Sequence, residues 1–201
     1  MMRIGITGGL GSGKSTAARF FGDRSAHIFD ADMEAKFILL RHEPIQRAVV
    51  AALGDSVLNE VGEIDFGRLA NYAFAKAERQ RRLNEIIHPE VILVAEREML
   101  AASRKGKTMF VLDVPLLFEA HMEQYLDYTL AVVADEELRI ERAMQRMTLT
   151  EAEIRRRTRL QLSDEERSAM ADFVVHNNGT IEELHQQLQD IYDTLLETQR
   201  S

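Results

Sequence analysis

The spacing most specific for chemistry lies in residues 8–15, which read Gly-Gly-Leu-Gly-Ser-Gly-Lys-Ser. They match the phosphate-binding P-loop pattern G-x-x-x-x-G-K-[ST], between a strand-like and a helix-like segment. Glycines permit a turn whose N–H groups surround a phosphate chain, and the N-terminus of the next helix adds positive charge. In this pattern Lys14 reaches the β- and γ-phosphates, and the Ser15 hydroxyl ligates Mg²⁺. A glycine-rich turn without a ligand is the alternative, but the context predicts binding of a nucleoside triphosphate.

Carboxylates follow two of the strand-like segments. Asp30 and Asp32 come after the second one, and alternation along a continued strand would place both on one side. A phosphoryl-transfer enzyme uses one carboxylate to orient or deprotonate the attacking hydroxyl, and often another for the metal. The alternative is that Asp30 caps the next helix and Asp32 adds to its dipole. Asp113 ends an apolar segment as in a Walker B strand, where it would hold Mg²⁺ through water, although a helix cap is again possible.

An arginine cluster follows the fourth strand-like segment. Arg139, Arg142 and Arg146 lie at i, i+3 and i+7 and so share one helix face. Such a face can close over a triphosphate as a lid that stabilises charge and excludes water, and we expect at least two of the arginines to contact phosphate. The alternative is a solvated face paired with nearby glutamates. The cluster consists of Arg139, Arg142, Arg146, Arg155, Arg156, Arg157 and Arg159.

Three shorter segments have two interpretations each. The apolar loop Pro115-Leu116-Leu117-Phe118-Glu119 either lines a substrate pocket or packs in the core. His88-Pro89 is expected to end one helix and begin the next, and a lone histidine there is more often a cap or a core residue than a ligand. Asn177-Asn178-Gly179 is expected to form a turn, whose amides are also able to read a purine.

The elements that must position these residues alternate between strands and helices. Strands are expected at 3–7, 26–30, 108–114, 128–134 and 172–176, because each segment is short, apolar and β-branched or aromatic. This alternation predicts an α/β fold with a mainly parallel five-stranded sheet flanked by helices on both faces. Ligands bind such sheets at the carboxyl ends of the strands, where the P-loop begins.

Residues 31–105 carry no strand signal and far exceed one crossover helix. Helices are expected at 31–41, 44–53, 66–75, 77–87, 89–103, 136–147, 151–160 and 181–198. Capping boxes mark helix starts at Thr150 with Glu153, Ser163 with Glu166, and Thr180 with Glu183. The sequence therefore predicts a single domain over 1–201, with a core (1–30, 106–135 and 171–201), a helical acceptor-binding region (31–105) and a lid region (136–170).

Composition narrows the class of protein. The 201 residues include no cysteine, which excludes disulfides, zinc–thiolate sites and thiol catalysis. The net charge of −8 argues against a nucleic-acid binder. No apolar run approaches the roughly 20 residues of a membrane helix, and no signal peptide precedes the first strand. We therefore expect a cytoplasmic protein with no nucleic-acid or membrane partner, either a monomer or a small homo-oligomer.

In their order and spacing, the motifs resemble those of the dephospho-coenzyme A kinase family nearly from end to end. They are Ile6–Ser15, Asp30-Ala31-Asp32, Ile87-His88-Pro89, Val114–Glu119, Gln145-Arg146 and Asn177-Asn178-Gly179. The resemblance implies a P-loop kinase fold with a helical substrate-binding insertion and an arginine-rich lid. It also implies transfer of the γ-phosphate of ATP, with Mg²⁺, to the ribose 3′-hydroxyl of dephospho-coenzyme A, the last step of coenzyme A synthesis.

The resemblance further implies roles for individual residues. Asp32 is similar to the family's base or hydroxyl-orienting carboxylate, and Lys14, Arg142 and Arg146 to its phosphate-contacting catalytic groups. The ATP cradle would be Gly9, Leu10, Gly11, Ser12, Gly13, Lys14, Ser15 and Thr16, with Asn177 and Gly179 at the adenine. The residues facing the acceptor would be Asp32, His88, Pro115, Leu116, Leu117 and Glu119. Ser15, Asp30 and Asp113 are the expected metal ligands.

Two other functions are compatible with a P-loop. Another small-molecule kinase on the same scaffold would differ only in its acceptor, which an acceptor screen identifies. A GTP-dependent switch needs a guanine-reading Asn-Lys-x-Asp and a switch Asp-x-x-Gly, and neither occurs in the sequence.

Overall fold

A computed structural model describes residues 1–146 and 149–200. The expected helix end at Met147 lies outside these residues. The chain divides into two units, one containing residues 1–30 and the described residues from Glu98 onward, the other Ala31–Arg97. The second unit falls within the helical region expected over 31–105.

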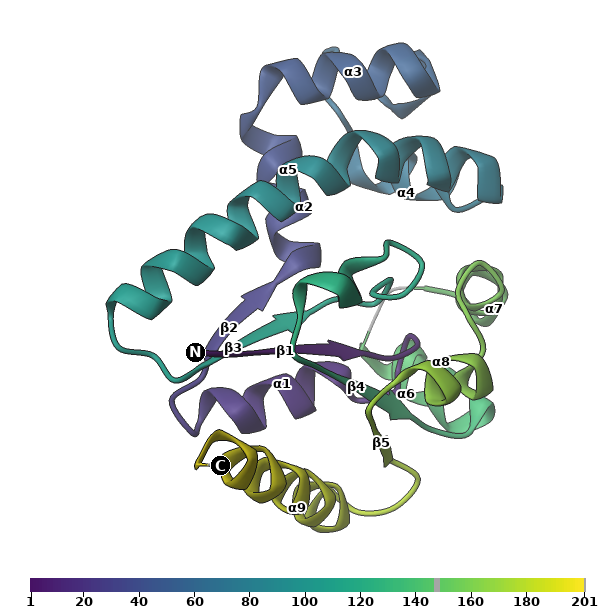
Figure 1. Ribbon diagram of the computed structural model, residues 1–201. Helices are drawn as coiled ribbons and strands as arrows, with labels where there is room; N and C mark the ends of the chain where they lie inside the picture. Colours follow the sequence, from purple (N-terminus) through teal and green to yellow (C-terminus); the bar gives the residue numbers. More distant parts are fainter. Residues whose placement is uncertain (147–148, 201) are drawn as a thin grey trace. The chain divides into compact units, whose positions relative to one another are not determined.

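The first unit is built on a parallel sheet (Figure 1). Its strands are β1 (Met2–Thr7), β2 (His27–Asp30), β3 (Met109–Asp113), β4 (Tyr128–Val133) and β5 (Phe173–His176). Within the described residues they form one five-stranded sheet in the order β2-β3-β1-β4-β5, and every pairing is parallel. The predicted fold class is confirmed. Because parallel strands end at the same edge, the register brings Asp30 beside Asp113.

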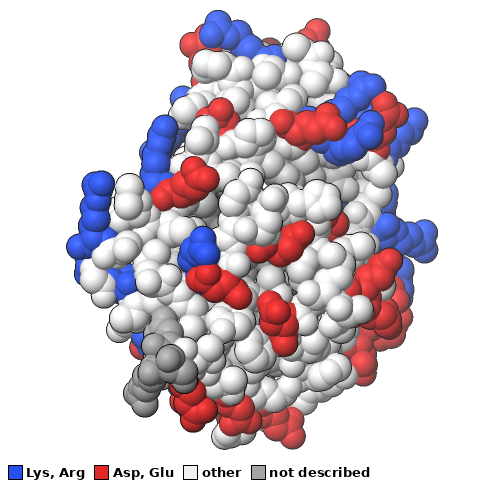
Figure 2. All heavy atoms as spheres, in the orientation of Figure 1, with Lys and Arg blue, Asp and Glu red and all other residues white. Residues whose placement is uncertain are grey.

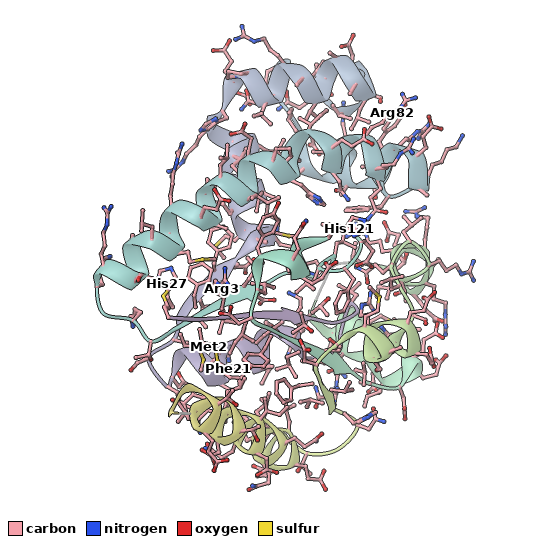
Figure 3. All side chains as sticks on the ribbon, in the orientation of Figure 1. Met2, Arg3, Phe21, His27, Arg82 and His121 are labelled. Carbon is pink, nitrogen blue, oxygen red and sulfur yellow. The ribbon has the colours of Figure 1, made fainter. Side chains whose placement is uncertain are left out.

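One face of this sheet packs against α1 (Lys14–Gly22) and α9 (Ile181–Arg200). Figure 3 shows Met2 of β1 and Phe21 of α1 close together in this layer, and both are buried in the same apolar cluster. On β1, the missing side chain of Gly5 leaves room for Leu117, whose Cγ lies 3.6 Å from where a Cβ would stand. This packing holds β1 and the P-loop that follows it in place.

The second unit is helical. Its elements are α2 (Ala31–Arg41), α3 (Glu43–Leu53), the 3₁₀ turn η1 (Asp55–Val57), α4 (Phe66–Ala73) and most of α5 (Ala77–Arg104). The side chain of Asp65 caps α4 by accepting a hydrogen bond from the Arg68 N–H, 2.7 Å long. The expected helices of this region are confirmed, with one exception.

The predicted helix boundary at His88-Pro89 is wrong, because α5 runs continuously from Ala77 to Arg104 with Pro89 inside it. An interior proline removes one backbone hydrogen bond and normally disrupts a helix. Here the buried positions continue at four-residue spacing on both sides of it, at Leu83, Ile87, Val91 and Ala95, while Pro89 itself is exposed. Burial of this stripe favours one long helix over two short ones.

The lid region contains α6 (Glu136–Arg146), α7 (Glu151–Thr158) and α8 (Asp164–Met170). The predicted capping boxes at Thr150 and Ser163 are both present. The reciprocal bonds between Thr180 and Glu183 confirm the third. Within the described residues, no helix has the length and apolarity needed to cross a membrane.

Candidate active site

The P-loop leaves the carboxyl end of β1 and enters α1 at Lys14. Gly11 and Gly13 have φ of 80° and 99°, a conformation that only glycine adopts without strain. The loop is closed by a 3.0 Å bond from the Ser12 N–H to the Gly9 carbonyl. The turn and the N-terminus of α1 together present the backbone dipoles that bind phosphate.

Lys14 forms an ion pair with Asp113, the last residue of β3. The Asp113 side chain is 5% exposed, and burial raises the pKa of this carboxyl, an effect that Lys14 opposes and neighbouring Asp30 adds to. Removing one charge from such a buried pair leaves the other uncompensated. The pair therefore joins Lys14 of the P-loop to the carboxyl edge of the sheet.

The two carboxylates of the Asp-Ala-Asp motif lie in different elements. Asp30 ends β2, and α2 begins at Ala31, which places Asp32 in the first helical turn. The expectation that strand alternation continues through Asp32 is therefore wrong, because β2 ends at Asp30 and the chain turns into a helix there. Asp32 is exposed and stabilises the α2 dipole, as the capping alternative expects.

The expected metal ligands Ser15, Asp30 and Asp113 supply one hydroxyl and two carboxylates, the oxygen ligands that Mg²⁺ prefers. Among residues 1–146 and 149–200, no three His, Cys, Asp or Glu side chains converge as a metal site. Mg²⁺ in nucleotide sites usually takes one or two protein ligands together with waters and substrate phosphates. The residues present fit a metal that arrives with the nucleotide.

The Asn177-Asn178-Gly179 turn supports the P-loop from the other side. The Asn177 side chain is buried and donates a 2.7 Å hydrogen bond to the Ser12 carbonyl. The Asn177 carbonyl accepts a 2.8 Å bond from Arg142 Nη1, which ties α6 to the turn. Asn178 bonds to Asp135 through both of its side-chain atoms. Gly179 follows in an exposed position.

The arginines of the cluster have different environments. Arg155 on α7 is ion-paired with Glu136, Glu137 and Glu151 at the surface, which is the solvated-face alternative. Arg146 is exposed. Arg139, in contrast, is 8% exposed and adjoins the P-loop, since a Cβ on Gly9 would overlap its Nη1.

The loop after β3 divides between packing and polar contacts. Leu117 is fully buried against β1, which favours the packing alternative for this residue, and the Pro115 carbonyl accepts a 3.1 Å bond from the Thr7 hydroxyl. Leu116 is partly exposed. Glu119 accepts a 2.9 Å bond from the Leu162 N–H, at the end of the lid region that follows α7.

His88, in the second unit, lies mid-helix on α5, and burial lowers its pKa. The imidazole is therefore neutral at neutral pH. The expected contact of His88 with the phosphoryl acceptor is then a hydrogen bond and not an ion pair.

Arg167 on α8 lies beside the P-loop, although no sequence motif predicts it there. Its side chain is 1% exposed and lies beside Gly9 and Asp164. The Ser163 capping box located its helix, but nothing in the local sequence distinguishes a buried arginine from the exposed ones of the same region. Only the packing of α8 against the P-loop does so.

Charge on the drawn face is mixed. Figure 2 shows Lys and Arg side chains interspersed with Asp and Glu, without one continuous positive patch on that face. In this acidic chain, the cations beside the P-loop are therefore few and local: Lys14, Arg139 and Arg167 within the described residues.

Comparisons with known proteins agree with this geometry. The family model described as dephospho-CoA kinase matches residues 2–183. A dephospho-CoA kinase of Geobacillus kaustophilus is 39% identical over 189 residues, which are 93% of each chain. The crystal structure of a Thermus thermophilus protein has a TM-score of 0.80 at 33% identity and covers 96% of this chain and 97% of its own. A dephospho-CoA kinase from Campylobacter jejuni shares the fold, with a TM-score of 0.67 at 22% identity over 98% of both chains.

Proposed function

The chain belongs to the dephospho-CoA kinase family and phosphorylates dephospho-CoA with ATP in coenzyme A biosynthesis, and on this premise we propose which residues carry out the transfer. The observation that supports the assignment most directly is the P-loop at the carboxyl edge of the parallel sheet, with Lys14 paired to Asp113. This is the donor half of a kinase site.

The phosphoryl group is transferred to the ribose 3′-hydroxyl. A bond forms between the 3′-oxygen and the γ-phosphorus, and the bond from that phosphorus to the β-γ bridging oxygen breaks, releasing ADP. Asp32 orients the hydroxyl and takes its proton. Asp32 is exposed in the first turn of α2, where a hydroxyl group of a substrate can reach its carboxylate.

The donor nucleotide is bound by the backbone of residues 9–16 and by Lys14. Arg142 and Arg146 contact phosphate when the lid region closes. Asn177 and Gly179 lie beside the adenine, where the Asn177 side chain acts through its bond to the Ser12 carbonyl of the P-loop and not through a contact of its own with the base. The bond from Arg142 to the Asn177 carbonyl supports this grouping, because it joins the lid helix α6 to the turn that carries the nucleotide contacts.

The acceptor is contacted by His88 and by Pro115, Leu116, Leu117 and Glu119 of the loop after β3. Of these, Leu117 acts through packing, since it is fully buried. Ser15, Asp30 and Asp113 would hold Mg²⁺, directly or through water. Bound Mg²⁺ neutralises phosphate charge during transfer. We also infer a cytoplasmic monomer or small homo-oligomer without nucleic-acid partners, which sedimentation of the purified protein tests for the oligomeric state.

Mass spectrometry of the product from ATP, Mg²⁺ and dephospho-CoA tests the activity and the position of the new phosphate. Lys14→Ala and Asp32→Asn should each lose most of kcat, because one removes the phosphate-binding cation and the other the proton acceptor. Glu34→Gln, in the same first turn of α2, is the matched control for Asp32. Near-normal turnover in Asp32→Asn would remove the base from the mechanism. Phosphorylation of shikimate or nucleoside monophosphates in place of dephospho-CoA would refute the proposed acceptor.

A further inference from the structure

Two buried guanidinium groups lie against the start of the P-loop. Arg139 on α6 and Arg167 on α8 are 8% and 1% exposed. A Cβ placed on Gly9 would overlap Arg139 Nη1 and would lie 3.5 Å from Arg167 Nη1. The absence of a side chain at position 9 leaves room for both guanidinium groups beside the loop backbone.

Two carboxylates, Asp164 and Glu119, form ion pairs with these arginines. Asp164 Oδ1 lies 3.0 Å from Arg167 Nη1 and 3.4 Å from Arg139 Nη1. The other Asp164 oxygen accepts a 3.3 Å bond from the Ala134 N–H, next to the end of β4. Glu119 lies 3.8 Å from Arg167 Nη2. These contacts fix both arginines to the sheet edge.

Several buried donors at this place lack an acceptor. Arg139 Nε and Nη1, Arg167 Nε and the Ser12 hydroxyl have no hydrogen-bond partner within the described part of the chain. A buried donor without a partner costs about 1–3 kcal/mol, and more when it is charged. Burial and the neighbouring charge of Arg139 also lower the pKa of Arg167. Asp164 and Glu119 oppose this shift and balance the two positive charges, but the unpartnered N–H and O–H donors still lack acceptor oxygens, which a phosphate supplies.

We propose that Arg139 and Arg167 form a clamp that binds the terminal phosphate of the nucleotide, with Asp164 as the residue that positions both arginines. This deepens the proposed function and rests on it. Arginine suits the role because its planar fork of N–H donors matches phosphate oxygens. Charge on the transferred group is spread over three equatorial oxygens, so that donors on several sides stabilise it.

Both the clamp and Lys14 contact β3 or the loop that follows it, which supports the assignment to the terminal phosphate. Glu119, which contacts Arg167, is in the loop after β3, and Lys14 is paired with the last residue of β3. In the P-loop motif, Lys14 is the group that reaches the β- and γ-phosphates. Arg155 differs from both: its side chain is 29% exposed and is already ion-paired with three glutamates.

Calorimetric titration of ADP and of the non-hydrolysable β,γ-imido analogue of ATP tests the clamp without any acceptor. In Arg139→Gln and Arg167→Gln the affinity for the analogue should fall about 10-fold or more, while the affinity for ADP stays within about twofold; kcat should fall on the order of 10²-fold. Arg139→Lys should restore little, because it keeps the charge and loses the fork. Arg155→Gln is the control and should match the wild type.

Asp164→Asn should lower kcat and analogue affinity together with little change in ADP affinity or in the melting temperature, a pattern that a purely structural role does not give. Equal losses for ADP and the analogue would overturn the assignment to the terminal phosphate. Unchanged analogue affinity in Arg139→Lys, the variant expected to fold in every case, would overturn the clamp. A wild type that binds the analogue but does not phosphorylate dephospho-CoA would refute the proposed function and leave the clamp standing.

Discussion

Replacing Asn177 with alanine tests whether this residue acts on the P-loop or on the base of the nucleotide. Its side chain is buried and donates a 2.7 Å hydrogen bond to the Ser12 carbonyl, 165 residues away in the sequence. Alanine removes a hydrogen bond worth about 1 kcal/mol and leaves a buried carbonyl unpaired, for a total of about 2 kcal/mol. For a chain of this size, that lowers Tm by about 4–8 °C.

The same loss should weaken phosphate binding. If nucleotide binding has to supply the full ~2 kcal/mol to order the loop, the Kd for nucleotide rises at most about 30-fold, because each ~1.4 kcal/mol corresponds to a tenfold change in Kd. Because the effect is on the loop, inorganic tripolyphosphate should lose affinity by the same factor as ATP. A contact with adenine would weaken ATP alone.

Calorimetric titration of Asn177→Ala with Mg·ATP and with Mg·tripolyphosphate measures both losses, and a thermal melt gives Tm. Asn178→Ala is the matched control, because its contacts are with Asp135 and not with the P-loop. If tripolyphosphate binds Asn177→Ala as it binds the wild type while ATP does not, the support of the P-loop is refuted in favour of base contact. Unchanged Tm and unchanged binding of both ligands would show that the Asn177–Ser12 hydrogen bond stabilises neither the fold nor the P-loop.

Two further predictions concern stability. Leu117→Ala should lower the free energy of unfolding by about 2–5 kcal/mol, because Leu117 is fully buried beside Gly5 and its truncation leaves a cavity. Urea unfolding measures this, and a loss as small as that of the partly exposed Leu116→Ala would contradict it. Burial lowers the pKa of His88 below its ordinary value of 6.5, so the folded state binds this proton less tightly than the unfolded state. Its contribution to stability is then present above pH 6.5 and is lost as the pH falls through the folded-state pKa. Urea unfolding from pH 8 to pH 5 should show this loss, and His88→Gln should make the profile flatter; parallel profiles for the two proteins would count against burial as the cause.

Local patterns predicted the scaffold well. The sequence predicts the ends of the five strands to within two residues of those observed. Short β-branched and apolar runs between helical segments of an α/β chain are typical of buried parallel strands. The capping boxes were located correctly because each depends on two residues three positions apart. At Pro89 the local rule failed, because burial on the opposite face of α5 outweighed the missing hydrogen bond.

Sequence alone also determined the family and the donor half of the site, since the P-loop pattern carries its own geometry in consecutive residues. The roles of the surrounding side chains were decided by tertiary structure. Nothing near Arg139 or Arg167 in the sequence tells that they are buried beside Gly9, and Asn177 reaches Ser12 only because β5 ends at the same edge of the sheet as β1. A motif is specified by neighbours along the chain, whereas burial, charge pairing and unmet hydrogen bonds depend on residues that only folding brings together.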